Sequence, residues 1–104
     1  MGWIDLEGGS EMADDNLMNI SADTYAQREL MASNVRRIRT LRGWSQEKLA
    51  QLAQIDRTHL ARFETRAINI SIDVMFRLAA ALRVDATRLL TPQEEWPTAQ
   101  DGED

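Results

Sequence analysis

The sequence predicts a compact all-α domain of five short helices, and three observations lead to this class. Apolar residues recur at three- and four-residue steps from about residue 24 to residue 90, which is the period of amphipathic helices. No segment rivals these helices with the strict alternation of a half-buried strand. Aromatic residues make up only 6% of the chain, so the core must rely on aliphatic residues that favour helices. A length of 104 residues allows about one small domain.

The first predicted helix runs from Thr24 to Arg42. Its apolar residues follow the helical period and comprise Tyr25, Leu30, Met31, Val35 and Ile38. Gly43 ends this helix, because glycine readily takes the left-handed backbone that follows a helix C-terminus.

Four further helices are predicted after Gly43, each introduced by a residue that can cap a helix N-terminus. These capping residues are Ser45, Asp56, Ser71 and Asp85. The four helices extend to Ala53, to about Thr65, to Leu82 and to Leu90. Their apolar stripes contain Leu49, Ala50, Leu52 and Ala53, then Leu60 and Phe63, then Ile72, Met75, Leu78, Ala79 and Leu82. Pro92 opposes continuation of the last helix.

The net charge of −5 conceals an uneven distribution. Residues 1–33 carry seven acidic residues and one Arg, residues 34–90 carry ten Arg and one Lys against five acidic residues, and residues 91–104 carry five acidic residues and no base. A basic central segment is the electrostatic signature of a nucleic-acid-binding surface. We therefore divide the chain into an acidic arm without stable structure (1–23), a DNA-binding domain (24–90) and a loose acidic tail (91–104).

The composition argues against several other function classes. The chain has no cysteine and a single histidine, His59, which excludes disulfides, thiolate metal sites and His-rich metal sites. No glycine-rich phosphate loop or paired-carboxylate motif is present, so we expect neither an enzyme nor a cofactor. No apolar run approaches the roughly 20 residues of a membrane helix, and the N-terminus is acidic rather than basic. We expect a cytoplasmic protein without membrane contact.

Several runs of sequence, in order and correctly spaced, resemble the Cro/repressor (XRE) family of helix-turn-helix regulators. Residues 43–50 (GWSQEKLA) resemble the start of its helix-turn-helix, and residues 55–64 (IDRTHLARFE) resemble its recognition helix. Residues 69–72 and 78–84 resemble its fourth and fifth helices. The likeness covers about residues 31–90 and is nearest in character to restriction-modification controller proteins and small phage-type repressors. It implies a lambda-repressor-like fold and a transcription regulator that binds an operator in double-stranded DNA.

Three positions depart from the pattern of the family. Gln54 stands where the family usually has glycine, so a left-handed backbone there would cost about 1 kcal/mol or more. Arg66 also stands at a frequent glycine position, and His59 replaces a residue that is commonly Tyr or Ser. These departures leave the predicted fold intact and weaken any inference about the operator sequence.

The resemblance also implies roles for individual residues. The expected contacts to DNA bases come from Arg57, Thr58, Ala61 and Arg62, which four-residue steps place on the helix face opposite Leu60 and Phe63. The expected phosphate contacts come from Ser45, Gln46, His59, Arg66, Asn69 and Ser71. Arg39 and Glu64 are expected to form an ion pair that ties the first helix to the recognition helix. The alternative is that the basic residues form a solvated face, and for Arg36, Arg37 and Arg42 the two interpretations are equally good.

Recognition of an operator by one short helix favours a homodimer on an inverted repeat, because two half-sites lie about 34 Å apart. The expected dimer interface contains Val74, Phe76, Val84, Leu89 and Leu90, with the segment 24–33 as an alternative. A competing function is an antitoxin or partner-binding protein of the same fold. In that case, the acidic arms would bind a basic protein partner or compete with DNA for the basic face.

Overall fold

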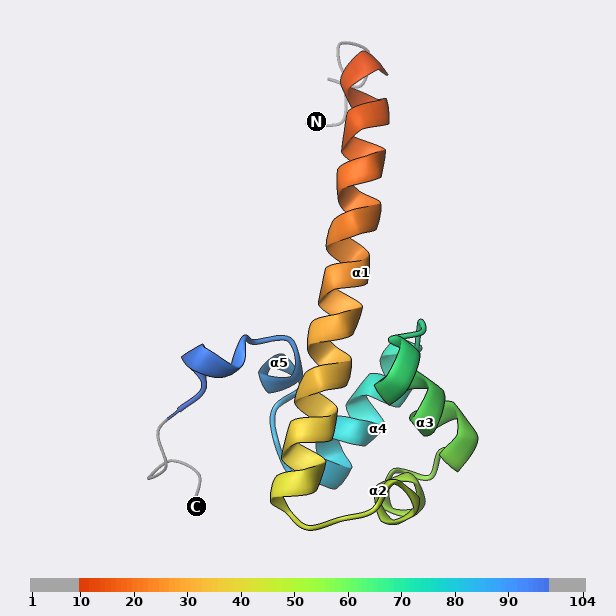
Figure 1. The fold of residues 1–104 in the computed structure, drawn as a ribbon, viewed down its shortest axis with the longest axis vertical. Coiled ribbons are helices and arrows are strands. Elements are labelled where there is room, and N and C mark those ends of the chain that lie inside the picture. The colour runs from red at the N-terminus through yellow and green to blue at the C-terminus, as the bar shows by residue number, and fades with distance from the viewer. Residues whose placement is uncertain (1–9, 98–104) are drawn as a thin grey trace.

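The computed structural model describes the backbone of residues 10–97 and the side chains of residues 22–97. Its helices are α1 (Ser10–Leu41), α2 (Gln46–Ala53), α3 (Arg57–Arg66), α4 (Ile72–Leu82) and α5 (Ala86–Leu89), followed by a short 3-10 helix, η2 (Gln93–Glu95). No strand occurs within this described range. Figure 1 shows α3 and α5 on opposite sides of the C-terminal half of α1. The predicted all-α, five-helix class is confirmed.

Helix α1 is longer than predicted, since it begins at Ser10 rather than at Thr24. The part of the acidic arm from residue 10 to residue 23, which was expected to lack structure, is therefore helical, and residues 1–9 lie outside the described range. The physical reason is that no glycine or proline stands between Ser10 and Leu41, while Ala, Leu, Met and Glu are strong helix formers. Acidic residues near a helix N-terminus also interact favourably with the helix dipole.

The hydrophobic core lies where the C-terminal half of α1 meets the other helices. Helix α1 contributes Met31, Ala32, Val35 and Ile38; the remaining helices contribute Leu49, Ala50, Ala53, Leu60, Phe63, Leu78, Ala79, Leu82 and Leu89. Most of the predicted apolar stripes are thus buried. Tyr25 (46%) and Leu52 (47%) are exposed, so their assignment to the apolar stripes is wrong. Ile72 is a further exception, since it is 69% exposed at the start of α4. It stands in the first turn of α4, before the buried stripe of that helix begins at Leu78.

Three predicted N-terminal caps are present as hydrogen bonds. The side chains of Ser45, Asp56 and Ser71 accept hydrogen bonds from the backbone N–H groups of Lys48 (3.0 Å), His59 (3.3 Å) and Val74 (3.1 Å). Asp85 occupies the cap position of α5 but makes no side-chain capping bond. The caps satisfy backbone donors that a helix start would otherwise leave unpaired.

Three non-glycine residues end helices in the left-handed conformation. Gln54 (φ 58°) does so after α2, as predicted, and Arg83 (φ 61°) does so after α4. After α3, the left-handed residue is Ala67 (φ 51°) rather than Arg66, which is still helical. Arg66 therefore does not replace a helix-ending glycine in this chain. Gly43 (φ 74°) takes the same role after α1 at no steric cost.

The tail packs on the domain further than predicted. Asn34, fully buried on α1, donates hydrogen bonds from Nδ2 to the carbonyl oxygens of Leu89 and Thr91, both at 2.9 Å. Gln93 Nε2 in turn donates to Asn34 Oδ1 at 3.2 Å. Trp96 packs against the core. The tail as far as Trp96 is thus attached to α1 and α5, which corrects the expectation of a loose segment from Gln93 onward; residues 98–104 lie outside the described range.

Candidate nucleic-acid interface

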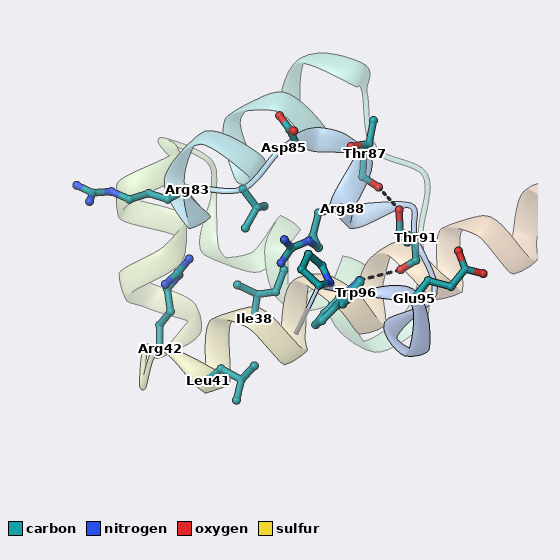
Figure 2. Close-up of a pocket in the computed structure, with 12 residues that line it drawn as sticks. Ile38, Leu41, Arg42, Arg83, Asp85, Thr87, Arg88, Thr91, Glu95 and Trp96 are labelled. Atoms are coloured by element: carbon teal, nitrogen blue, oxygen red, sulfur yellow. Dashed lines mark hydrogen bonds between the residues drawn. The ribbon is translucent and has the colours of Figure 1, made fainter. Parts of the chain in front are cut away.

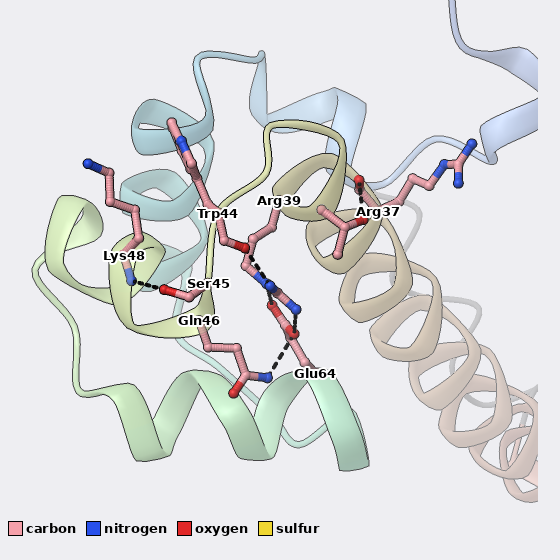
Figure 3. A network of polar contacts seen from close by, with 8 residues as sticks. Arg37, Arg39, Trp44, Ser45, Gln46, Lys48 and Glu64 are labelled. Carbon is pink, nitrogen blue, oxygen red and sulfur yellow. Dashed lines mark hydrogen bonds and ion pairs between the residues drawn. The ribbon is translucent and has the colours of Figure 1, made fainter.

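The recognition helix α3 is fixed to α1 by a buried ion pair. Arg39 donates from Nε and Nη2 to the two carboxylate oxygens of Glu64, both at 2.8 Å, and from Nη1 to the carbonyl oxygen of Trp44 at 2.7 Å (Figure 3). The side chains of Arg39 and Glu64 are only 11% and 1% exposed. This is the pair that the resemblance implied. A bidentate, charge-assisted contact fixes the orientation as well as the distance of the two helices.

Gln46 joins α2 to the same carboxylate. Its Nε2 donates to Glu64 Oε1 at 3.0 Å, so one acidic side chain holds α1, α2 and α3 together. An amide nitrogen carries two hydrogens, so this bond leaves a second donor on Gln46. The residue is half-buried and stands in the first turn of α2, where the helix dipole is positive.

The outward face of α3 gathers the four side chains expected to reach DNA bases. Arg57, Thr58 and Arg62 are exposed, and Ala61 is half-buried. All four line one shallow hollow of about 300 Å³ together with Thr65 and Arg66. Opposite this face, Leu60 and Phe63 are fully buried. Thr65 was not singled out from the sequence, although its position, four residues after Ala61, places it on the same face.

The residues expected to contact phosphates surround this helix. Ser45 and Ser71 are exposed, and their hydroxyl groups still have a hydrogen to donate after accepting their capping bonds. Arg66 and Asn69 are exposed around the loop after α3, whereas His59 is half-buried. Arg28 Nε donates to the carbonyl oxygen of Ala67 at 2.9 Å and so attaches this loop to α1. No sequence motif signalled that contact.

The residues expected at a dimer interface differ in their exposure. Phe76 (57%) and Leu90 (40%) are exposed, and Val74 and Val84 are half-buried. Leu89 is fully buried in the core of its own chain, so its assignment to an interface is wrong. A four-residue helix such as α5 needs an inward anchor, and Leu89 provides it. Ile72 lies one helical turn before Phe76 and adds to the exposed apolar surface of α4.

Another hollow, of about 600 Å³ and drawn in Figure 2, has no lining residue from α3. It is bounded by the end of α1, the turn between α4 and α5, and the tail. Arg88 lies over the ring of Trp96 at 5.6 Å, and Trp96 Nε1 donates to the carbonyl oxygen of Thr91 at 3.0 Å. These contacts hold the tail against α5. No residue of α2 or α3 lines the hollow, so it lies outside the helix-turn-helix.

An exposed basic helix, seated on a second helix through a tight left-handed turn and fixed by a buried ion pair, defines a helix-turn-helix DNA-binding domain. A helix-turn-helix family model matches residues 35–89, which is more than half of the chain. The chain belongs to this family, in its XRE-type branch of DNA-binding transcription regulators, and is related to restriction-modification controller proteins.

Two related sequences illustrate the relationship. A hypothetical transcription factor from Neisseria meningitidis serogroup B is 41% identical over 73 residues, which cover 70% of this chain and 69% of the relative. The control protein C.SmaI from Serratia marcescens is 35% identical over 66 residues, which cover 64% and 79% of the two chains.

Solved structures give the same relationship. The crystal structure of the hypothetical transcription factor NHTF from Neisseria superposes with a TM-score of 0.63 at 40% identity and covers 66% of this chain and 79% of that one. The restriction-modification controller protein C.AhdI from Aeromonas hydrophila superposes with a TM-score of 0.58 at 33% identity, covering 62% and 97%. Within the described residues, no helix is both long and apolar enough to cross a membrane.

Proposed function

We propose that this protein is a homodimeric, sequence-specific transcription regulator that binds an inverted repeat in double-stranded DNA and works in the cytoplasm. The observation that carries the proposal is the shared hollow on the outward face of α3, lined by Arg57, Thr58, Ala61 and Arg62. In the major groove, the two arginines can each form a fork to O6 and N7 of a guanine. Thr58 can bond a base edge or touch a thymine methyl group, and the small Ala61 permits close approach.

Phosphate contacts would position this helix on the duplex. Gln46 supports such a role, because its amide nitrogen can donate one hydrogen to Glu64 and the other to a phosphate oxygen. Ser45 and Ser71 can donate their hydroxyl hydrogens, and Arg66 and Asn69 extend the contact beyond α3. We include half-buried His59 among these phosphate contacts. The buried Arg39–Glu64 pair then acts as a scaffold that holds α3 at a fixed angle to the phosphate-binding groups.

A two-fold axis would bring two α3 helices to successive major grooves. Helix α3 is about 15 Å long and reads only a few base pairs, so two half-sites separated by about 34 Å are needed for specificity. Exposed apolar side chains on α4 and near the end of α5 support an interface there: Ile72, Phe76 and Leu90, flanked by Val74 and Val84. Apolar surface of this kind is unfavourable in water and favours burial in a dimer.

The test is selection from a pool of randomised DNA duplexes at two salt concentrations, followed by sequencing of the bound fraction. We expect an inverted repeat and an affinity that falls steeply with salt, because phosphate neutralisation releases counterions. Arg57→Ala and Arg62→Ala should each relax one base position by about 1–3 kcal/mol. Arg37→Ala is the matched control, since Arg37 is exposed and points away from α3 (Figure 3). A folded dimer that enriches no motif would contradict the proposal.

The dimer is tested separately. Phe76→Glu places a charge in the exposed apolar surface of α4 and should convert the wild-type dimer into a monomer in sedimentation velocity at high salt, where contacts between oppositely charged surfaces are screened. Leu41→Glu is the matched control, because Leu41 is also exposed (64%) but lies at the end of α1. If the wild-type chain, the α4 variant and the control variant all dimerise equally, α4 is not part of the interface.

A further inference from the structure

A second basic surface lies beside the helix-turn-helix, away from the outward face of α3. A groove of about 500 Å³ runs between the end of α1, helix α2 and the C-terminal half of α4. Its cationic residues are Arg42, Lys48 and Arg83, all exposed, and no acidic residue lines it. Figure 3 shows Lys48 and Trp44 pointing to the side away from Glu64, and Figure 2 shows Arg42 and Arg83 near one another.

The floor of this groove is apolar. Trp44, Leu52 and Ala80 line it, and Leu52 is 47% exposed. Arg42 lies over the Trp44 ring at 5.8 Å and donates to the carbonyl oxygen of Leu82, so its guanidinium group is held at the rim. In the described part of the chain, the one ion pair is Arg39–Glu64, so none of the three cationic residues of the groove is paired with a carboxylate. An apolar floor with a cationic rim suits a helix that carries both apolar and acidic residues.

The chain itself contains such a helix. The N-terminal half of α1 extends beyond the core: Ala22 through Gln27 are exposed, and the first buried residue is Met31. In the extension, residues 10–27, the sequence has four acidic residues and no basic residue, together with Met12, Leu17, Met18 and Ile20. Most of the stability of a helix in a protein comes from packing of its apolar side chains, so docking would favour this extension.

The extension cannot reach the groove of its own chain. Helix α1 is continuous from Ser10 to Leu41, about 48 Å at 1.5 Å per residue, and the groove adjoins its C-terminal end. Figure 1 shows the extension projecting away from the other helices. The same geometry opposes the idea that the acidic segment covers the recognition face of its own chain. Any contact between extension and groove must therefore join two copies.

We propose that the acidic extension of α1 docks into the Arg42–Lys48–Arg83 groove of a second copy of this chain. Two copies with antiparallel α1 helices can exchange extensions reciprocally, which satisfies both grooves and closes the assembly. The outward face of α3 is the weaker candidate for the same segment, because the one apolar residue that lines its hollow is the small Ala61, whereas the groove offers Trp44 and Leu52. This contact is separate from the α4 surface and does not require DNA binding.

The absence of cysteine from the sequence permits a direct test on the full chain. A nitroxide label is attached to one copy through Asp15→Cys, and this copy is mixed with a ¹⁵N-labelled copy that carries no nitroxide, so that signal broadening reports only contacts between copies. We expect broadening at the backbone amides of Leu52, Ala80 and Ala81, reduced at high salt because the contact is electrostatic. A nitroxide at Asp73→Cys, on α4, shows separately what an α4-mediated dimer would broaden.

Charge reversal in the observed copy completes the test. Arg83→Glu should weaken the broadening at least about tenfold, since like charges then face each other across the contact. Arg57→Glu, on α3, is the matched control and should leave the broadening unchanged. Absence of broadening, broadening centred on α3, or groove broadening that survives Arg83→Glu would each overturn the proposal. Selection of the operator by the Arg83→Glu chain is measured in parallel, so that loss of docking and loss of DNA binding are distinguished.

Discussion

Two buried polar clusters hold this domain together on opposite sides of α1, and they differ in chemistry. The Glu64 cluster is charged: Arg39 and Gln46 both bond one carboxylate, and they join α1, α2 and α3. The Asn34 cluster is neutral: one amide bonds two backbone carbonyl groups and the side chain of Gln93, and it joins α1 to α5 and the tail. The comparison teaches that the side of α1 that carries α2 and α3 depends on charge, whereas the side that carries α5 and the tail depends on hydrogen bonds to backbone carbonyl groups.

The largest effect is expected from breaking the charged cluster. Glu64→Ala leaves the Arg39 guanidinium, whose side chain is 11% exposed, without its carboxylate. We expect a loss of about 3–5 kcal/mol in the free energy of unfolding, measured by denaturant titration. Glu47→Ala, an exposed carboxylate on α2, is the control and should change stability little. Equal effects of the two substitutions would show that the pair contributes little to stability.

Asn34→Ala is expected to have the second-largest effect. It removes the donor for the carbonyl groups of Leu89 and Thr91 and leaves a small cavity beside α5. We expect a loss of about 1–3 kcal/mol, with faster hydrogen exchange in α5 than in α3. Asn69→Ala, in the exposed loop after α3, serves as the control. Uniform loss of protection over the whole domain would contradict a local role of Asn34 on the α5 side.

A matched pair of glutamines compares the clusters directly. Gln46 donates to a charged acceptor at 3.0 Å, and Gln93 donates to a neutral one at 3.2 Å. We expect Gln46→Ala to cost about 1.5 kcal/mol and Gln93→Ala about 0.5–1 kcal/mol, because bonds to charged groups are stronger. Under the proposed function, Gln46→Ala should also weaken DNA binding, while Gln93→Ala should not. If Gln93→Ala cost more stability than Gln46→Ala, the proposed difference between the charged and the neutral cluster would be refuted.

The smallest effect is expected at the turn between α2 and α3. Gln54→Gly relieves the left-handed backbone of Gln54 but adds freedom to the unfolded chain, so we expect a net gain of about 0.5 kcal/mol. The substitution leaves the hydrogen bonds of the Glu64 cluster and of the Asn34 cluster in place. Thermal unfolding of Gln54→Gly combined with Asn34→Ala should therefore give the sum of the separate effects. A non-additive result would mean that the turn and the α5 side are coupled.

The sequence predicted the helix-turn-helix well because local chemistry determines it. Ser45, Asp56 and Ser71 are strong capping residues, and each of them caps a helix in the structure. Helical periodicity also located the buried face of α3, with Leu60 and Phe63. The resemblance to a known family supplied the Arg39–Glu64 pairing, which periodicity alone does not show.

The failures of prediction have a different physical origin. An acidic segment without an apolar period gave no signal for the N-terminal part of α1, because helix propensity alone sustains that part. Asn34 was missed because a buried asparagine looks like an exposed one in sequence, and its partners lie more than 50 residues away. Leu89 was placed at a dimer interface because the sequence does not show which apolar residues of a small domain its own core can accommodate.

Asn34 and Arg39 stand on the same helix, five residues and about 7.5 Å apart along its axis. A shift of α1 along its axis by one turn would therefore break the hydrogen bonds of both Asn34 and Arg39. The contacts on each side of α1 thus oppose such a shift. The turns of α1 from Asn34 to Arg39 should exchange their amide hydrogens only through global unfolding. Helix α3 thus moves as part of one cooperative unit with α5 and the tail, although the hydrogen bonds of Asn34 and Gln93 in the described part of the chain do not involve α3.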